Sequence, residues 1–242
     1  MNNSVLMIPV FNLSLAFIPV LIVISILYRW SLDYGNALYA VSRMLVQLLL
    51  VGYFLAFIFE TDSAWVVLSV LTVMVLVSSW IALRAVHTKR RILYKKSLLA
   101  IALGGGTTLI LITQGVLDLQ PWYWPRYMIP LAGMIFSGAM NSVSLASERM
   151  NAEIERNIPF ERARGIALKA SLIPITNSLF AVGLVSLPGM MTGQVLSGVS
   201  PLIAARYQIM VMCMIYSAAG ISSACFLYLI NASNLETLFN TG

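Results

Sequence analysis

The sequence predicts an all-α polytopic membrane protein with about seven transmembrane helices. Of the 242 residues, 60% are hydrophobic and 10% are charged, and the mean hydropathy is +0.88, a composition outside the range of soluble globular domains. The chain also contains seven apolar runs close to the ~20 residues that a helix needs to cross a bilayer. The runs lack the alternation typical of a membrane β-barrel, so we expect helices.

The seven predicted spans are separated by short polar or charged connections. They are 8–28, 37–58, 64–83, 97–117, 127–147, 170–188 and 203–230. No basic segment precedes the first run, so we interpret it as a retained span rather than a signal peptide. We expect the whole chain, 1–242, to form a single transmembrane domain.

The distribution of Lys and Arg predicts that the N-terminus lies outside and the C-terminus lies in the cytoplasm. In this orientation the outer connections hold only Arg126 and Arg206, and the other connecting cations fall on the inner side. These inner cations are Arg29, Arg84, Lys89, Arg90, Arg91, Lys95, Lys96, Arg149, Arg156, Arg162, Arg164 and Lys169. Because cations beside membrane spans mark the cytoplasmic face, the net charge of +6 does not indicate nucleic-acid binding.

Apart from Arg206, which falls in the first turn of 203–230, one cation lies inside a predicted span. Arg43 lies in the run 37–58, with Gln47 one turn later. An Arg at the middle of a membrane costs about 2.5–3.5 kcal/mol on insertion scales. Two interpretations stay open: the side chain reaches back to the cytoplasmic headgroups, or it faces the interior of the helix bundle.

Small and polar residues mark the fourth and fifth spans. The run Gly104–Gly106 predicts close helix packing and lacks the Gly-Lys-Ser/Thr ending of a phosphate loop. In the fifth span Gly133, Ser137, Asn141 and Ser144 fall on one helix face, which predicts a packing face or an aqueous pathway. We find no ATP-binding motif and no hydrolase constellation in the spans, so we predict a chain that is not an enzyme and holds no cofactor.

The stretch 171–194 contains more polar and helix-breaking residues than a simple membrane helix needs. It contains Thr176, Asn177 and Ser178 in sequence, and we expect Asn177 to face a pathway and Ser178 to bond back to its own helix. The residues expected to act as flexible points are Pro174, Gly183, Pro188 and Gly189.

The segment 148–169 precedes that stretch and carries charges of both signs. Pro159 predicts a helix break followed by a new short helix beginning near Phe160. The segment is either a solvated connector or a docking surface for a soluble partner, with Phe160 as an apolar anchor. The candidate docking residues are Glu153, Glu155, Arg156, Pro159, Phe160, Glu161, Arg162 and Arg164.

Three phrases of the C-terminal half resemble a known family. They are IPLAGMIFSGAMNSVSLASERM at 129–150, SLIPITNSLFAVGLVSLPGMMTGQVLSG at 171–198 and YQIMVM in the last span. They resemble the FetB-like permeases of iron-export ABC transporters, a group whose plant relatives are linked to aluminium tolerance. The resemblance is strong in this half and looser in the N-terminal half.

The resemblance implies a permease that pairs with a second copy of itself and with two copies of a separate ATP-binding subunit, which carries ATP and Mg. It also implies that the 148–169 segment is the coupling helix and that the protein lies in a bacterial inner membrane. The family commonly has a Gly-Ala-Thr-Pro-like turn, whereas this chain has Arg156-Asn157-Ile158-Pro159 and a following helix that we expect to be shorter. The geometry of coupling, or the choice of partner, therefore differs from the family norm.

The expected function is ATP-driven export of iron or another metal ion. The candidate pathway residues are Ser137, Asn141, Thr176, Asn177, Met190, Met191 and Thr192. Iron rests on the resemblance alone, because no Asp or Glu falls inside a predicted span to serve as a hard ligand. Two alternatives stay open: export of a small organic solute such as a nucleotide sugar, and a channel without ATP coupling. A neighbouring gene for an ATP-binding cassette protein would favour the transporter.

Overall fold

The computed structural model describes residues 8–230, apart from the side chains of Ala56 and of residues 87–89. Within this range the regular structure is helical, with one isolated bridge between Val182 and Ser186. The contacts divide the chain into two compact units, 1–61 and 62–242, and each is described by itself. The expectation of one domain over 1–242 stays a prediction.

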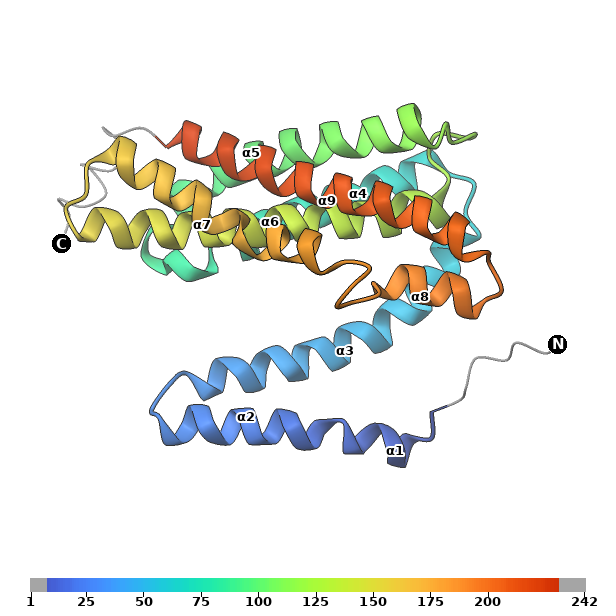
Figure 1. Ribbon diagram of the computed structural model, residues 1–242, viewed down its shortest axis with the longest axis horizontal. Coiled ribbons are helices and arrows are strands. Elements are labelled where there is room, and N and C mark those ends of the chain that lie inside the picture. Colours follow the sequence, from blue (N-terminus) through green and yellow to red (C-terminus); the bar gives the residue numbers. More distant parts are fainter. Residues whose placement is uncertain (1–7, 231–242) are drawn as a thin grey trace. The chain divides into compact units, whose positions relative to one another are not determined.

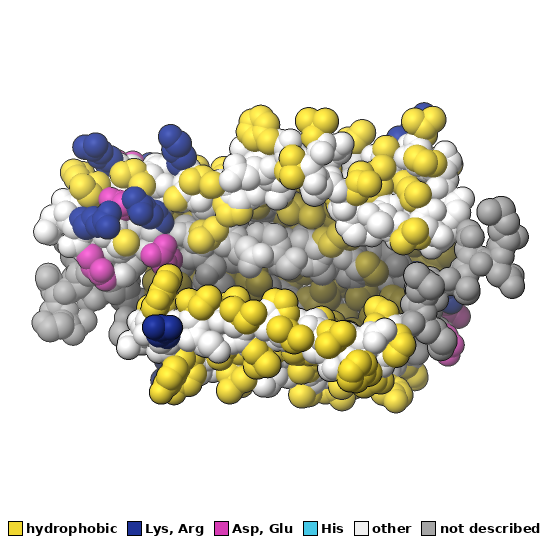
Figure 2. All heavy atoms as spheres, turned by 60° about the horizontal axis from the view of Figure 1, so that its bottom comes forward, with side chains coloured by type: hydrophobic (Ala, Val, Ile, Leu, Met, Phe, Trp, Pro, Cys, Tyr) yellow, Lys and Arg dark blue, Asp and Glu magenta, His cyan; other side chains and the backbone are white. Residues whose placement is uncertain are grey.

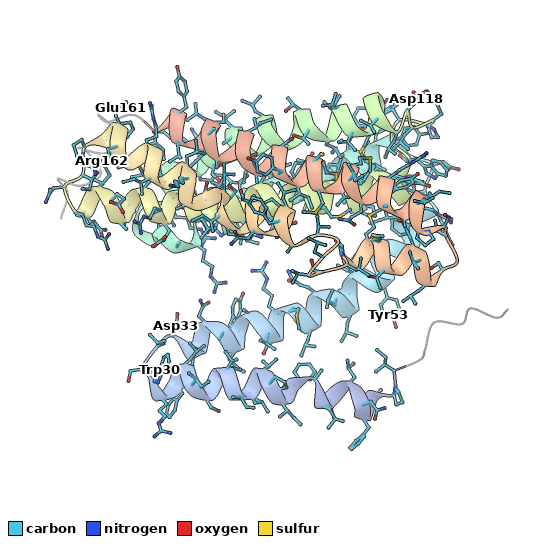
Figure 3. All side chains as sticks on the ribbon, viewed as in Figure 1. Trp30, Asp33, Tyr53, Asp118, Glu161 and Arg162 are labelled. Atoms are coloured by element: carbon cyan, nitrogen blue, oxygen red, sulfur yellow. The ribbon has the colours of Figure 1, made fainter. Side chains whose placement is uncertain are left out.

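The first unit is a helical hairpin, drawn in blue in Figure 1. Its elements are α1 (Val10–Leu15), α2 (Phe17–Arg29) and α3 (Tyr34–Phe59). The Asp33 carboxylate accepts a 2.9 Å hydrogen bond from the backbone N–H of Asn36 and so caps the start of α3. Figure 3 shows Trp30 and Asp33 at the turn between α2 and α3, with Tyr53 toward the far end of α3. The predicted spans 8–28 and 37–58 are confirmed as helical.

Arg43 is half-buried on α3 and has a partner one turn away. When the Gln47 amide is oriented with its oxygen toward the guanidinium, that oxygen accepts from Nε at 3.1 Å and from a terminal nitrogen at 3.3 Å. The contact satisfies part of the guanidinium within its own helix. It does not decide between the two interpretations of Arg43.

The second unit is a bundle in which α6 and α9 pack against each other and against α5 and α7 (Figure 1). Its elements are α4 (Ala64–Ala82), the 3-10 turn η1 (Arg84–Lys89), α5 (Arg90–Ile110), the π-helical turn η2 (Leu111–Val116), α6 (Pro125–Glu155), α7 (Phe160–Ala181), α8 (Gly189–Leu196) and α9 (Pro201–Leu229). Pro125 and Pro201 occupy the first positions of α6 and α9, where a missing N–H costs no helical hydrogen bond.

The core of this unit depends on small residues at helix crossings. A Cβ atom on Gly104 would lie under 3 Å from Ser222 of α9, and one on Gly105 would lie 2.8 Å from the ring of Phe136 of α6. A Cβ atom on Gly106 would have no neighbour within 4 Å, because this residue faces away from both helices. Close packing is therefore confirmed for the first two glycines of the run and not for the third.

The basic segment after α4 is largely helical rather than a loop. Arg90, Arg91, Lys95 and Lys96 lie on the first turns of α5, which begins seven residues earlier than the predicted span 97–117. Arg90 donates from Nε and from a terminal nitrogen to the carbonyl of Trp80, at 3.0 and 2.7 Å. Its guanidinium also lies 3.8 Å from the centre of the Trp80 ring. These contacts fix the reversal between α4 and α5.

The described residues contain six helical segments that are long and apolar enough to cross a membrane. They are Val10–Arg29, Tyr34–Phe59, Ala64–Ala82, Arg90–Val116, Pro125–Glu155 and Pro201–Leu229. The remaining predicted span, 170–188, is not a continuous helix, because α7 ends at Ala181 and α8 begins at Gly189. The prediction of a short helix after Pro159 is also wrong, since α7 has 22 residues. The chain is a polytopic all-helical membrane protein.

Candidate functional site

A charged turn joins α6 to α7 at one end of the second unit. The N–H of Asn157 donates to the carbonyl of Ile154 at 2.9 Å, and the N–H of Ile158 donates to the carbonyl of Glu153 at 3.1 Å. These bonds satisfy two of the last carbonyls of α6 while Asn157 adopts a φ of 60°. Pro159 then precedes the first residue of α7, as the sequence predicted for the break.

Glu153 lies inside this turn rather than on its surface. Glu153 is 4% exposed, and its carboxylate lies 2.6 Å from a terminal nitrogen of Arg149 and 3.6 Å from a terminal nitrogen of Arg156. A buried carboxylate needs such partners because leaving one charge unpaired away from water is costly. The Glu153 carboxylate therefore links the last turn of α6 to the residue that begins the turn.

The outer surface of the turn carries the other candidate docking residues. Glu155 accepts a 2.6 Å hydrogen bond from Asn151, Glu161 pairs with Arg164, and the Arg164 guanidinium lies 5.9 Å from the centre of the Phe160 ring. Glu161 and Arg162 project from the start of α7 at the end of the bundle opposite Asp118 (Figure 3). Figure 2 shows charged side chains of both signs gathered at this end.

A cleft of about 210 Å³ lies between α6, α7 and α9, and we name it the serine cleft. Its lining consists of Gly138, Asn141, Ser142, Leu145, Ser171, Pro174, Ile175, Ser178, Ile215 and Ala219. The hydroxyl of Ser142 donates to the carbonyl of Ser171 at 3.4 Å, which ties α6 to α7 across the base of the cleft. The lining supplies hydroxyl, amide and apolar groups and no charged side chain.

The structure brings two of the predicted site residues, Asn141 and Pro174, together in the serine cleft. Ser137 is exposed one turn before Asn141 and does not line it. Thr176 is half-buried and Asn177 is exposed, and neither lines the cleft. The expected pathway role of Asn177 is untested. The expectation for Ser178 is confirmed, because its hydroxyl donates to the Pro174 carbonyl at 3.0 Å.

A second cleft, of about 230 Å³, lies between α6, α8 and α9 at the other end of the unit, and we name it the methionine cleft. Its lining consists of Leu117, Arg126, Tyr127, Pro130, Leu131, Met134, Met190, Tyr207 and Met210. Met190 and Asn141, both candidate pathway residues, therefore line different clefts. Met191 and Thr192 line neither cleft, and the Thr192 hydroxyl donates to the Pro188 carbonyl at 3.2 Å.

One of the predicted flexible points lies inside a helix, and the other three lie in or next to the connection 182–188. Pro174 lies within the continuous helix α7, where it removes one helical hydrogen bond. Gly183 has a φ of +83° in the connection 182–188, a conformation that favours glycine, and its N–H donates to the Ser186 carbonyl at 3.0 Å. Pro188 and Gly189 mark the start of α8. The interruption of the sixth predicted span therefore begins near Gly183 and ends at Pro188.

Sequence reasoning missed several residues of the serine cleft. Ser142 and Ser171 are 3% and 2% exposed and join two helices, and Gly138 allows the close approach of Ile215. Ser142 directly follows Asn141 and lies on an adjacent face of the helix. The polar pattern of the fifth span could therefore have indicated it. Ile215 and Ala219 carry no polar group that would have marked them.

Groups of three or more His, Cys, Asp or Glu side chains placed to hold a metal ion are absent from the described part of the chain. The carboxylates of the α6–α7 turn are engaged with Arg or Asn instead. The serine cleft offers neutral oxygen groups, and the methionine cleft offers thioether groups.

Comparison with curated proteins finds relatives along most of the chain. A UPF0014 membrane protein of Synechocystis is 42% identical over 75% of this chain and 76% of its own length. The probable iron export permease protein FetB of Escherichia coli is 34% identical over 89% of this chain and 90% of its own length. The ALUMINUM SENSITIVE 3 protein of Arabidopsis thaliana is 33% identical over 88% of this chain and 83% of its own length.

No solved structure matches the chain. The family model described as "Uncharacterised protein family (UPF0014)" matches residues 10–159 and 159–234. Together with the six apolar helical segments and the membrane-protein relatives, this match places the chain in a lipid bilayer. The protein is an integral membrane protein of the UPF0014 family, which includes the probable iron export permease FetB and plant aluminium-sensitivity proteins.

Proposed function

We propose that the chain is the transmembrane permease subunit of an ABC transporter that exports iron or another metal ion. In this proposal it pairs with a second copy of itself and with two copies of a separate subunit that binds and hydrolyses ATP with Mg. The chain itself catalyses no reaction. Its proposed place is a bacterial inner membrane, with the N-terminus outside and the C-terminus in the cytoplasm.

The α6–α7 turn is the observation that carries the proposal. Two long helices, α6 and α7, meet there in a compact tip whose inner charge is paired through Glu153 and whose outer face is charged and carries Phe160. In this proposal, a movement of the soluble partner displaces the tip, and the tip displaces both helices. The Escherichia coli relative is named as a probable iron export permease, which supports the same proposal.

The proposed motion follows from the connectivity after the turn. The turn leads directly into α7, α7 lines the serine cleft, and the interrupted connection 182–188 joins α7 to α8. Displacement of the tip would move α7 against α6 and α9, which opens or closes the cleft between them. The Ser178–Pro174 bond lies within α7 and would help to keep that helix intact during the motion. The Ser142–Ser171 bond joins α6 to α7, so it would have to break or act as the pivot of the motion.

Association with the ATPase tests the proposal. Phe160→Asp places a charge on the half-buried ring position at the tip and is expected to abolish co-purification with the ATP-binding subunit. Phe160→Ala, which adds no charge, is expected to weaken it. Ile92→Asp makes the same chemical change at an exposed position near the start of α5 and is the matched control. Normal co-purification and transport by Phe160→Asp would refute docking through the turn.

A second candidate cargo is a small organic solute. The serine cleft favours it, because neutral hydroxyl and amide groups suit a hydrogen-bonding solute better than a hard cation that prefers carboxylates. The ATPase rate of the reconstituted complex, measured with a panel of metal ions and of nucleotide sugars, separates the two cargoes. Stimulation by metals alone supports the first, and a flat response to every metal supports the second.

A further inference from the structure

The methionine cleft combines a cationic mouth with an apolar wall. Arg126 is exposed at the beginning of α6, and the side chains of Tyr127 and Tyr207 line the same cleft beside it. Met134 of α6 and Met210 of α9 line its apolar part. A cleft with polar donors at one end and apolar groups along its length matches an amphipathic ligand.

Aromatic side chains indicate how deep the mouth lies in the bilayer. The rings of Trp124 and Tyr127 are 5.1 Å apart, and those of Trp122 and Tyr123 are 5.5 Å apart. Trp and Tyr gather at the level of the lipid headgroups in membrane proteins. Arg126 lies between Trp124 and Tyr127 in the sequence, so its guanidinium belongs at the level of the lipid phosphates.

The cleft runs from this level toward the membrane interior. Arg126 and Met134 are eight residues apart on α6, which corresponds to about 12 Å along the helix axis. Pro130 and Leu131 line the wall between them. The apolar part is thus long enough to contact the upper part of an acyl chain whose phosphate is at Arg126.

The charge at the mouth of the methionine cleft indicates the charge of the ligand that would bind there. Among the described residues that line the cleft there is no Asp or Glu. Among residues 8–230 the ion pairs involve Arg149, Arg156 and Arg164, so Arg126 keeps its charge uncompensated by a described carboxylate. An uncompensated guanidinium in a cleft that Tyr127 and Tyr207 also line favours an anionic headgroup over a zwitterionic one.

We propose that the methionine cleft binds one anionic phospholipid, with its phosphate at Arg126 and an acyl chain along Met134 and Met210. The lipid would contact α6, α9 and Met190 of α8 together. Because α8 follows the interrupted connection 182–188, the bound lipid joins this short helix to the two long ones. The proposal concerns lipid binding alone and holds whether or not the chain works with an ATPase.

Lipid retention by the purified full chain tests the proposal. The protein is equilibrated with phosphatidylglycerol or phosphatidylcholine of identical acyl chains, and the bound lipid is counted by native mass spectrometry. The wild type is expected to retain phosphatidylglycerol preferentially. Arg126→Gln is expected to reduce that preference about fivefold, the factor that one cation near an anionic lipid surface contributes.

Arg206→Gln is the matched control. It removes the same charge from an exposed residue at the same end of the bundle, on α9, and Arg206 does not line the cleft. This variant is expected to retain phosphatidylglycerol like the wild type. Equal losses in both variants would overturn the proposal, because a diffuse effect of net charge would explain them.

A second variant tests the acyl-chain part. Met210→Trp fills the apolar part of the cleft and is expected to lower retention of both lipids, with thermal unfolding measured alongside to confirm that the variant folds. Soluble glycerol phosphate, which has the headgroup charge without acyl chains, is expected not to displace bound phosphatidylglycerol. Displacement at matched concentrations would overturn the lipid assignment in favour of a soluble anion.

Discussion

The backbones of α5 and α9 touch at Gly104 and Ser222. A Cβ atom on Gly104 would clash with the Ser222 hydroxyl oxygen and would lie 2.6 Å from the Ser222 backbone nitrogen and 2.9 Å from its Cα atom. The hydroxyl can rotate away, but the backbone atoms cannot. A side chain at position 104 therefore has to separate two closely packed helices of the second unit.

Gly104→Ala is expected to destabilise the folded protein by about 1–3 kcal/mol, the usual cost of forcing extra atoms into a packed interior. Thermal unfolding in detergent measures the effect. Gly106→Ala adds the same methyl group two residues later, where no atom lies within 4 Å, and is expected to be neutral or stabilising through its higher helix propensity. Equal destabilisation by both variants would contradict the role assigned to the α5–α9 contact.

Gly105→Ala is expected to be less damaging than Gly104→Ala. The added methyl group would lie 2.8 Å from two atoms of the Phe136 ring, and a side chain can shift where a backbone cannot. In a double-mutant cycle with Phe136→Leu, we expect a coupling free energy of about 0.5–3 kcal/mol, as for residues in direct contact. Additive effects in the unfolding measurements would show that the ring does not limit the space at position 105.

Glu153→Gln is expected to destabilise the α6–α7 turn, because it leaves the Arg149 guanidinium beside a buried neutral amide. Water reaches the Arg149 side chain, which is 39% exposed, so the expected cost is about 1–3 kcal/mol, as for the loss of a hydrogen bond to a charged group. Glu148→Gln removes an exposed carboxylate from the same end of α6 and is expected to have little effect. Hydrogen exchange of residues 154–162 measures the change, and unaltered protection in Glu153→Gln would show that the ion pair does not order the turn.

The apolar runs of the sequence predicted the long helices well, because hydropathy responds to the lipid-facing sides of each one. The same signal failed for 170–188, where apolar composition continued through Gly183 while the backbone left the helix. The end of α6 was also hidden, since its last turn is charged and continues the helix eight residues beyond the predicted span. The π-helical turn Leu111–Val116 has no distinctive composition.

The candidate site was predicted only in outline. Residues with a single strong property, such as Pro159 at the break or Ser178 beside Pro174, behaved as their chemistry indicated. Position in a cleft depends on which helices are neighbours, and the sequence did not contain that information. The polar run Thr176, Asn177 and Ser178 shows the limit: three consecutive residues point in three directions on a helix, and of these Ser178 lines the serine cleft.

Asn141→Leu tests whether the serine cleft is part of the transport pathway, and it rests on the proposed function. The amide of Asn141 lines the cleft, so its loss removes hydrogen bonds to a passing cargo and is expected to slow transport about two- to tenfold. ATP-dependent transport by proteoliposomes that contain the permease and its ATPase is the measurement. Ser137→Leu changes an exposed polar residue one turn away on the same helix, outside the cleft, and is expected to transport normally. Because both variants replace a polar side chain of α6 with the larger, apolar leucine, a general defect of that helix would affect them alike. Equal transport by the two variants would place the pathway elsewhere in the bundle.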